Sequence, residues 1–211
     1  KELLLACYNG SSEMVTQLSN AVVTFLFNIV LMNLAGEHGV AAITILLYGQ
    51  FLFNAFYLGF SIGISPIVGY QYGAGNRKEL KSIYRISFRF VSLSSVIIAF
   101  AAVYLSTGIV TIFTDDPKTH ALAVTGFGIF AYSFLFSGFN IASSGFFTAL
   151  SDGKSSAIIS FCRTLLFTVI SLLVLPRFFG VNGAWLAIPV AEFVTLLLSI
   201  WMHRKYLYRF I

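Results

Sequence analysis

The stretch of sequence that decides the architecture runs from Gly59 to Asn76 and reads GFSIGISPIVGYQYGAGN. It closes an uncharged run that begins at Gly39 and exceeds the ~20 residues that a helix needs to cross a bilayer core. Five basic residues follow within a short distance: Arg77, Lys78, Lys81, Arg85 and Arg89. Such clusters mark the cytoplasmic side of membrane proteins. The boundary at Asn76 therefore predicts both a lipid environment and an orientation.

The composition agrees with a membrane environment. The 211 residues are 58% apolar and only 10% charged, whereas soluble chains carry about 25% charged residues. The net charge of +5 comes from basic residues near the ends of apolar runs, so we interpret it as topology and expect no nucleic-acid partner. Cys7 and Cys162 are far apart, and the three histidines occur singly. We therefore expect no disulfide framework and no metal site.

Six apolar spans can be bounded along the chain. They cover about residues 3–34, 40–68, 86–106, 121–150, 156–175 and 183–202. Their hydrophobic runs are continuous, whereas membrane-spanning strands alternate apolar and polar residues. The sequence therefore predicts an all-α, polytopic membrane protein with six transmembrane helices that form a single unit.

The positive charges predict the topology of these spans. With the 77–89 loop inside, the inside set holds Lys1, Arg77, Lys78, Lys81, Arg85, Arg89, Lys154, Arg163, Arg204, Lys205 and Arg209. The outside set holds Lys118 and Arg177. This asymmetry places both ends of the chain in the cytoplasm. We expect the protein itself to be an integral protein of the cell (inner or plasma) membrane. The chain opens at Lys1 without a signal-peptide pattern, so we expect a longer protein.

No motif of the sequence indicates an enzyme. Gly153-Lys154-Ser155 resembles the end of a phosphate-binding loop, but Thr148 stands where that loop needs its first glycine. The run from Gly73 to Gly75 lacks the third glycine of a dinucleotide fingerprint. We therefore expect neither catalysis nor a cofactor.

Polar residues form one stripe on each of three predicted spans. The stripes are Glu13, Gln17, Asn20, Thr24 and Asn28; Gln50, Asn54, Tyr57, Ser61 and Ser65; and Ser133, Ser137, Asn140, Ser144 and Thr148. Polar groups at membrane depth must face a polar neighbour or water. Two interpretations stay open, namely hydrogen bonds that hold helices together and a shared water-filled cavity. In the second interpretation, the residues that line the cavity are Gln17, Asn20, Gln50, Asn54, Tyr57, Tyr132, Asn140 and Ser144.

Three charged residues fall inside predicted spans. Glu13 is either a first-turn acid at the interface, favoured by the helix dipole, or a buried functional carboxylate. Arg163 and Glu192 lie in the last two spans, about 10 Å and 16 Å from the cytoplasmic side at helical rise. The long arginine side chain can span this difference by leaning inward. The two residues predict a structural ion pair, because buried charges are normally paired, and the alternative is that Glu192 binds a proton.

Gly59, Gly63 and Pro66 have two interpretations of their own. The glycines have the small-xxx-small spacing that lets membrane helices approach closely, and Pro66 removes a backbone hydrogen bond. Helix packing and a hinge account for this pattern equally well.

Three motifs carry a resemblance to a known family. They are Asn9 to Glu13, Gly59 to Asn76, and the run Gly183-Ala-Trp-Leu-Ala-Ile-Pro-Val-Ala-Glu192. In these motifs and in the order of its spans, the chain resembles the multidrug and toxic compound extrusion (MATE) family. That family has twelve spans in two six-helix lobes, and this chain looks like the second lobe, with the first missing upstream.

The resemblance implies xenobiotic efflux, in which bulky organic cations are exchanged for protons or sodium ions by alternating access. Glu13 aligns with an acid that family members use for ion coupling. Some members also have an ion-binding aspartate on the fourth helix of this lobe. Span 4 has no acid between His120 and Ser151 here, and Asn140 is its strongest polar group. This difference puts a sodium site of that kind in doubt.

Two alternatives stay open, one within transport and one in a different functional class. A lipid-linked saccharide flippase of the same superfamily needs basic groups for a pyrophosphate, and only Arg163 is available at depth. A membrane scaffold that oligomerises through Gly59 and Gly63 has no use for Glu13 or for the amide stripes. The prediction is therefore an antiporter.

Overall fold

The chain was examined in a computed structural model that describes residues 11–206, without the side chains of residues 11–13 and 15. Throughout this part it is helical and contains no strand, which confirms the all-α prediction. The elements are α2 (Ser11–Gly73), α3 (Arg77–Phe113), α4 (Pro117–Phe130), the 3₁₀ turn η1 (Ala131–Ser133), α5 (Phe134–Ala149), α6 (Gly153–Phe161), the π-helical turn η2 (Cys162–Leu166) and α7 (Phe167–Tyr206).

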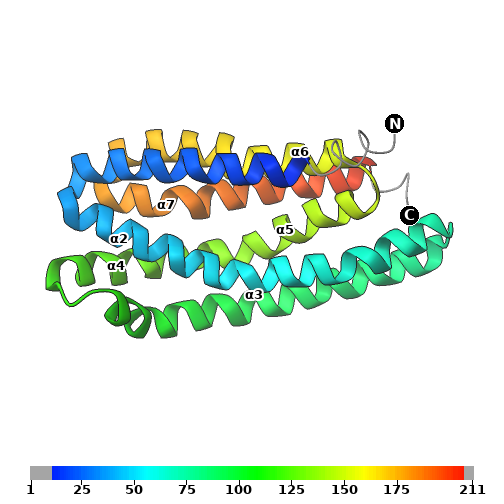
Figure 1. The fold of residues 1–211 in the computed structure, drawn as a ribbon, viewed down its shortest axis with the longest axis horizontal. Helices are drawn as coiled ribbons and strands as arrows, with labels where there is room; N and C mark the ends of the chain where they lie inside the picture. The colour runs from blue at the N-terminus through cyan, green and yellow to red at the C-terminus, as the bar shows by residue number, and fades with distance from the viewer. Residues whose placement is uncertain (1–10, 207–211) are drawn as a thin grey trace.

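Two glycines break the longest helices. Gly36 in α2 has φ 63° and ψ −151°, and Gly180 in α7 has φ 57° and ψ −133°. Glycine adopts positive φ without the steric cost of a side chain. The chain reverses direction at both points, so α2 and α7 each consist of two arms that run in opposite directions (Figure 1). The arms of α2 are residues 11–35 and 37–73, and those of α7 are 167–179 and 181–206. Where the sequence predicted loops around 35–39 and 176–182, the structure therefore has a turn at a single glycine.

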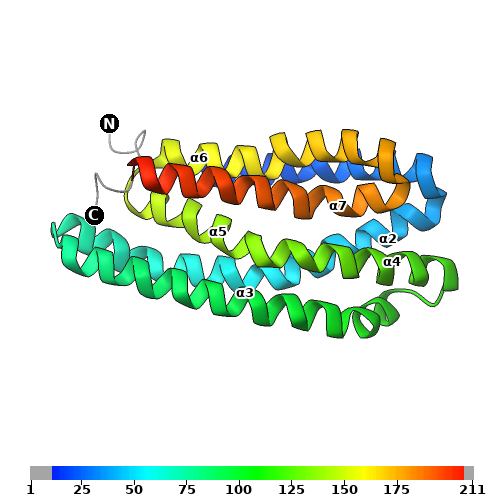
Figure 2. The same ribbon diagram turned by 180° about the vertical axis from the view of Figure 1, so that it is seen from behind.

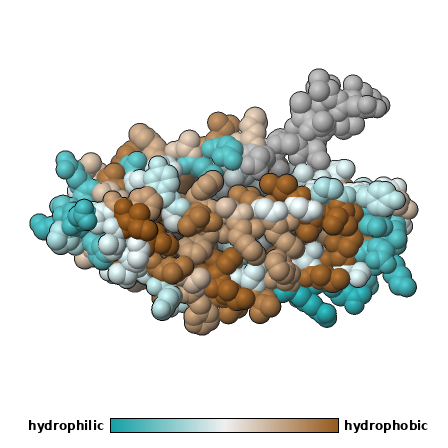
Figure 3. All heavy atoms as spheres, turned by 60° about the horizontal axis from the view of Figure 1, so that its bottom comes forward, coloured by the Kyte–Doolittle hydropathy of each residue, from teal (hydrophilic) through white to brown (hydrophobic). Residues whose placement is uncertain are grey.

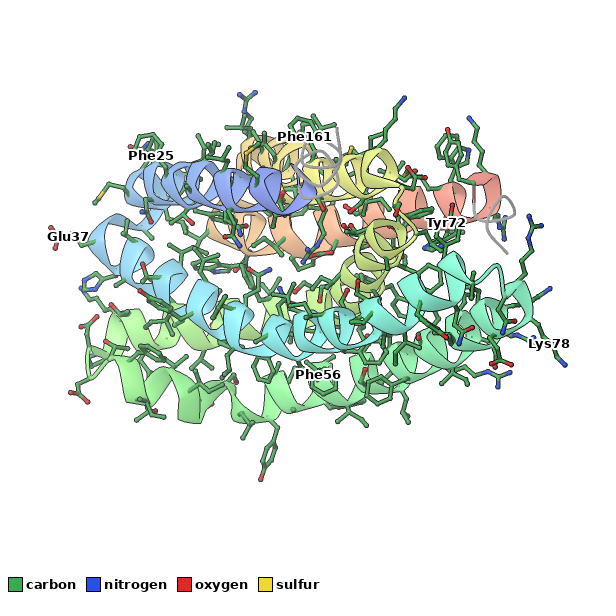
Figure 4. The ribbon with its side chains drawn as sticks, turned by 45° about the vertical axis from the view of Figure 1, so that its right-hand side comes forward. Phe25, Glu37, Phe56, Tyr72, Lys78 and Phe161 are labelled. Atoms are coloured by element: carbon green, nitrogen blue, oxygen red, sulfur yellow. The ribbon has the colours of Figure 1, made fainter. Side chains whose placement is uncertain are left out.

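The helices are long and apolar enough to cross a membrane. The four continuous candidate segments are Thr16–Gly73, Arg77–Phe113, Pro117–Ala149 and Gly153–Tyr206. Each contains an 18-residue apolar window, with mean hydropathies of 1.7, 2.3, 1.6 and 2.3. Most of the hydrophilic surface in Figure 3 lies at the two ends of the molecule, with an apolar band between them. Phe25 and Phe161 point outward from the side of the bundle, while Glu37 and Lys78 mark opposite ends (Figure 4). This distribution matches a lipid-exposed bundle.

Short connections with side-chain caps join the helices. Asn76, Asp116 and Asp152 precede α3, α4 and α6, and each side chain accepts a hydrogen bond from a backbone N–H of the first turn. At Asp116 this bond comes from Thr119 at 2.8 Å. Hydrogen bonds from Thr119, aided by His38 with its Nδ1 2.9 Å from the Asp116 carboxylate, hold the pKa of Asp116 below its ordinary value. His38 lies two residues after Gly36, so this pair ties the turn of α2 to the start of α4.

The bundle core packs large side chains against small residues. Phe27, Phe127 and Trp185 are at most 1% exposed. A Cβ on Gly126 would lie 2.8 Å from Leu46 Cδ2 and 3.1 Å from the Trp185 ring, so only glycine fits there without a shift. Gly59 and Gly63, which the sequence suggested for packing, are exposed and would meet no atom within 4 Å. Within the described residues neither glycine packs against another helix, and their packing or hinge role stays a prediction.

The membrane orientation can be tested with single cysteines. Arg85 and Asp115 are exposed. Arg85 lies near the start of α3 and Asp115 just beyond its end, so about 40 Å of helix separates them at helical rise. In a background where Cys7 and Cys162 are serine, we expect cysteine at 85 to react with an impermeant maleimide only from the cytoplasm. Cysteine at 115 should react only from the other side. Labelling of position 115 from the cytoplasm alone would show that the predicted orientation is wrong.

Candidate functional site

The first arm of α2 keeps its polar stripe at the surface. Gln17, Asn20 and Thr24 are exposed, and the Asn28 amide oxygen is buried without a hydrogen-bond partner among the described residues. Their spacing of three and four residues places them on one face of the helix. An amide exposed to hydrocarbon is costly. This face of the bundle is therefore suited to a polar surface or to water.

Arg163 and Glu192 meet inside the bundle, as predicted from their depths. Arg163 Nε donates to Glu192 Oε1 at 2.8 Å, and the two side chains are 14% and 4% exposed. The Asn140 amide nitrogen donates to Glu192 Oε2 at 2.7 Å and to the Glu192 carbonyl at 2.9 Å. Ser199 Oγ in turn donates to the Asn140 amide oxygen at 3.1 Å. The network joins η2, α5 and the second arm of α7, and it occupies both carboxylate oxygens.

A local change of helical geometry accompanies this network. Residues Cys162–Leu166 form a π-helical turn between α6 and α7, and Arg163 lies within it. The Thr168 hydroxyl donates to the Arg163 carbonyl at 2.8 Å, five residues back. Single π turns inside α-helices often occur at functional sites. The turn marks the place where the arginine enters the bundle.

A second polar cluster joins α5 to α6. Ser144 Oγ lies 2.8 Å from Ser156 Oγ and 2.9 Å from Ser160 Oγ, and Thr148 donates to Ser156 at 2.7 Å. Ser144 and Thr148 belong to the third predicted stripe. These bonds fit the interpretation of polar groups as links between helices.

The other predicted cavity residues fall into two groups. Tyr57 and Asn140 are buried in the bundle, and the Tyr57 hydroxyl donates to the Phe134 carbonyl at 3.2 Å. Asn54 is half-buried and accepts from Ser137 at 3.1 Å. Gln50 is also half-buried, while Tyr132 is 62% exposed. Tyr57 and Asn140 therefore already have hydrogen-bond partners within the bundle. The predicted cavity residues that reach the surface of the bundle are Gln50, Asn54, Tyr132 and the stripe on the first arm of α2.

Glu13 lies in the first turns of α2, but its side chain is outside the described part of the chain. Its predicted role in ion coupling therefore stays a prediction. Among the described residues, no three His, Cys, Asp or Glu side chains gather in a way that could hold a metal ion.

Sequence analysis missed the link between Asn140, Glu192 and Ser199. Asn140 was assigned to a cavity and Ser199 to no site, although both lie at membrane depth. Asn140 Nδ2 lies 2.7 Å from the Glu192 carboxylate. Nothing in the sequence signalled this contact, because the two residues are 52 positions apart.

Comparisons with known proteins identify the fold and the family. The sequence profile of the MatE family matches residues 14–173. The chain is similar to a solved MATE structure in complex with MaL6, at 19% identity and a TM-score of 0.91 over 100% of this chain and 48% of that one. It is also similar to an outward-facing multidrug resistance MATE family transporter, at 20% identity and a TM-score of 0.91 over 100% and 48% of the two chains.

A third similar structure is a MOP superfamily transporter from Pyrococcus furiosus, at 19% identity and a TM-score of 0.89 over 97% of this chain and 47% of that one. The comparison with curated proteins finds no match. The chain thus spans about half the length of the solved transporters that it matches, as one six-helix lobe does. With a family profile matched over most of its length, this membrane-spanning chain belongs to the MatE family of transporters.

Proposed function

We propose that the complete protein is a secondary antiporter that exports organic cations in exchange for protons or sodium ions. In this proposal the chain is the second lobe, and the substrate moves between it and a first six-helix lobe by alternating access. The observation that carries the proposal is the exposed stripe of Gln17, Asn20 and Thr24 on an otherwise apolar helix. A partner lobe and a water-filled cavity would supply the polar surroundings that lipid lacks.

The proposed cavity combines this stripe with aromatic surface. Tyr132, 62% exposed, and Phe56, 46% exposed, offer π faces, which attract organic cations. Glu13 lies one helical turn before Gln17 and would bind the coupling ion or the cationic substrate. The proposed orientation keeps both ends of the chain in the cytoplasm.

A lipid-linked saccharide flippase is less favoured by the geometry. A pyrophosphate substrate needs unpaired basic groups, and Arg163 is already neutralised by Glu192 at 2.8 Å. A scaffold function does not explain an exposed amide stripe.

Transport by the complete protein tests the proposal directly. In liposomes with an imposed proton or sodium gradient, we expect gradient-driven uptake of a cationic dye. Asn20→Leu should lower the rate roughly threefold to tenfold, as expected for the loss of one hydrogen bond. Val22→Leu is the matched control, because Val22 is exposed on the same arm and already apolar. Absence of dye uptake under either gradient, in protein that is correctly inserted, would contradict the antiport proposal.

A further inference from the structure

A half-open cavity lies between α3, α5 and the second arm of α7, away from the polar stripe of α2. Its volume is about 450 Å³, and its walls include Phe88, Phe139, Leu196, Ile200, His203 and Arg204. In Figure 2 the last turns of α7 run beside α5, and α3 lies on the other side of α5. No element of the described chain covers Ile200, which is 42% exposed. The cavity therefore opens on the side of the bundle that is expected to face lipid.

The interior of the cavity is aromatic and uncharged. The His203 ring packs against Tyr84, Phe88 and Phe147 at centroid distances of 5.4, 5.3 and 4.9 Å. Both of its ring nitrogens are buried and have no hydrogen-bond partner among the described residues. A charged imidazole is costly in such surroundings, so the ring acts as part of the apolar wall. No acidic residue of the described part of the chain lines the cavity, so these walls offer an organic cation no counter-charge.

Positive charge lies only at the rim. Arg204 lines the cavity at the end of α7, and Lys81 lies on α3 one turn before Tyr84, on the same helical face. Both are exposed, and neither has a carboxylate within ion-pair distance among the described side chains. Glu79 is the acid nearest to Lys81 in sequence, and its backbone N–H donates a hydrogen bond to the Asn76 side chain that caps α3. An apolar slot with a basic rim is complementary to an amphipathic anion.

We propose that this cavity binds one anionic phospholipid of the leaflet at the basic end of the bundle. The acyl chain would lie against Phe88, Phe139 and Ile200, and the phosphate would lie at Arg204 and Lys81. Basic pockets between membrane helices on the cytoplasmic side bind acidic headgroups in this way. The proposal concerns binding to the lobe and holds whether or not the protein is an antiporter.

The position of the cavity gives the lipid a structural consequence. Ser199 lines it and also donates to Asn140, which holds the Glu192 carboxylate. Ser199 is itself 1% exposed, so a bound acyl chain would lie directly against the side chain that connects the cavity to the buried network of Arg163, Glu192 and Asn140.

Native mass spectrometry of the complete protein tests the proposal. The protein is incubated with equal amounts of phosphatidylglycerol and phosphatidylcholine of the same chain length. We expect phosphatidylglycerol to be retained, and Arg204→Gln to reduce its retention about fivefold, as expected for one basic residue at an acidic headgroup. Lys205→Gln is the matched control, because Lys205 is adjacent in sequence but stacks on Trp201 at 4.6 Å outside the cavity. It should leave retention unchanged.

A second variant separates the cavity from the surface charge. Ile200→Trp keeps every charge and fills the slot from its open side, and we expect it to displace the lipid. Equal retention of the two lipids would overturn the proposal. Equal loss in Arg204→Gln and Lys205→Gln, or full retention in Ile200→Trp, would also overturn it, since binding would then be a general effect of basic residues. If Arg204→Gln does not fold, Ile200→Trp alone decides between the two outcomes.

Discussion

Glu13→Gln in the complete transporter is expected to abolish ion-gradient-driven efflux of a cationic dye while leaving membrane insertion intact. The substitution keeps the shape of the side chain and removes its charge. In a cavity of low dielectric constant the charged carboxylate is disfavoured without a cation, so a proton, a sodium ion and an organic cation should compete for it. That competition is the physical basis of antiport. The measurement is dye efflux from cells or liposomes at matched protein levels.

Two further variants sharpen this prediction. Glu13→Asp should retain part of the activity, because the charge remains and is displaced by about 1.5 Å, comparable to one residue of helical rise. Glu37→Gln is the matched control, since Glu37 is exposed beside the Gly36 turn at one end of the bundle. Efflux at the normal rate in Glu13→Gln would remove this carboxylate from the mechanism. Glu13 would then be a first-turn acid at the interface, favoured by the helix dipole.

The second large effect concerns the buried ion pair. Arg163→Ala leaves the Glu192 carboxylate, whose side chain is 4% exposed, with only the Asn140 amide. Glu192→Ala leaves the guanidinium of Arg163 without its 2.8 Å partner. Breaking a buried pair from one side typically costs about 3–5 kcal/mol. We therefore expect each single variant to lower the yield of folded protein, as measured by monodisperse recovery in detergent and by thermal unfolding.

The exchanged pair Arg163→Glu with Glu192→Arg is expected to restore part of this loss. Recovery would be incomplete, because Asn140 donates to a carboxylate at position 192 and cannot donate to an arginine there. Glu192→Gln separates structure from coupling, because its amide oxygen can still accept the hydrogen bond of Arg163 and the side chain keeps its size. Its amide nitrogen cannot accept the second bond, which Asn140 donates to the carboxylate. If Glu192→Gln folds normally but does not transport, a structural role does not explain the loss of transport. Glu192 is then a proton site.

Much of the architecture follows from the sequence because lipid acts as the solvent along each span. A helix must satisfy its own backbone in hydrocarbon, so continuous apolar runs and clusters such as Arg77 to Arg89 predicted the helical spans and the side on which each connection lies. The depths of Arg163 and Glu192 could be matched for the same reason, because the rise per residue is constant. These properties depend on a single helix at a time.

Only the tertiary structure decided which helix faces meet. The same periodicity put Gln17, Tyr57 and Asn140 on comparable stripes, yet Gln17 is exposed, while Tyr57 binds the Phe134 carbonyl and Asn140 binds Glu192. Likewise Gly59 and Gly63 have the spacing for close packing, but Gly126 is the glycine that Leu46 and Trp185 press against. The reason is physical: a stripe defines a direction around one helix axis, whereas its partner depends on how all the helices are rotated together.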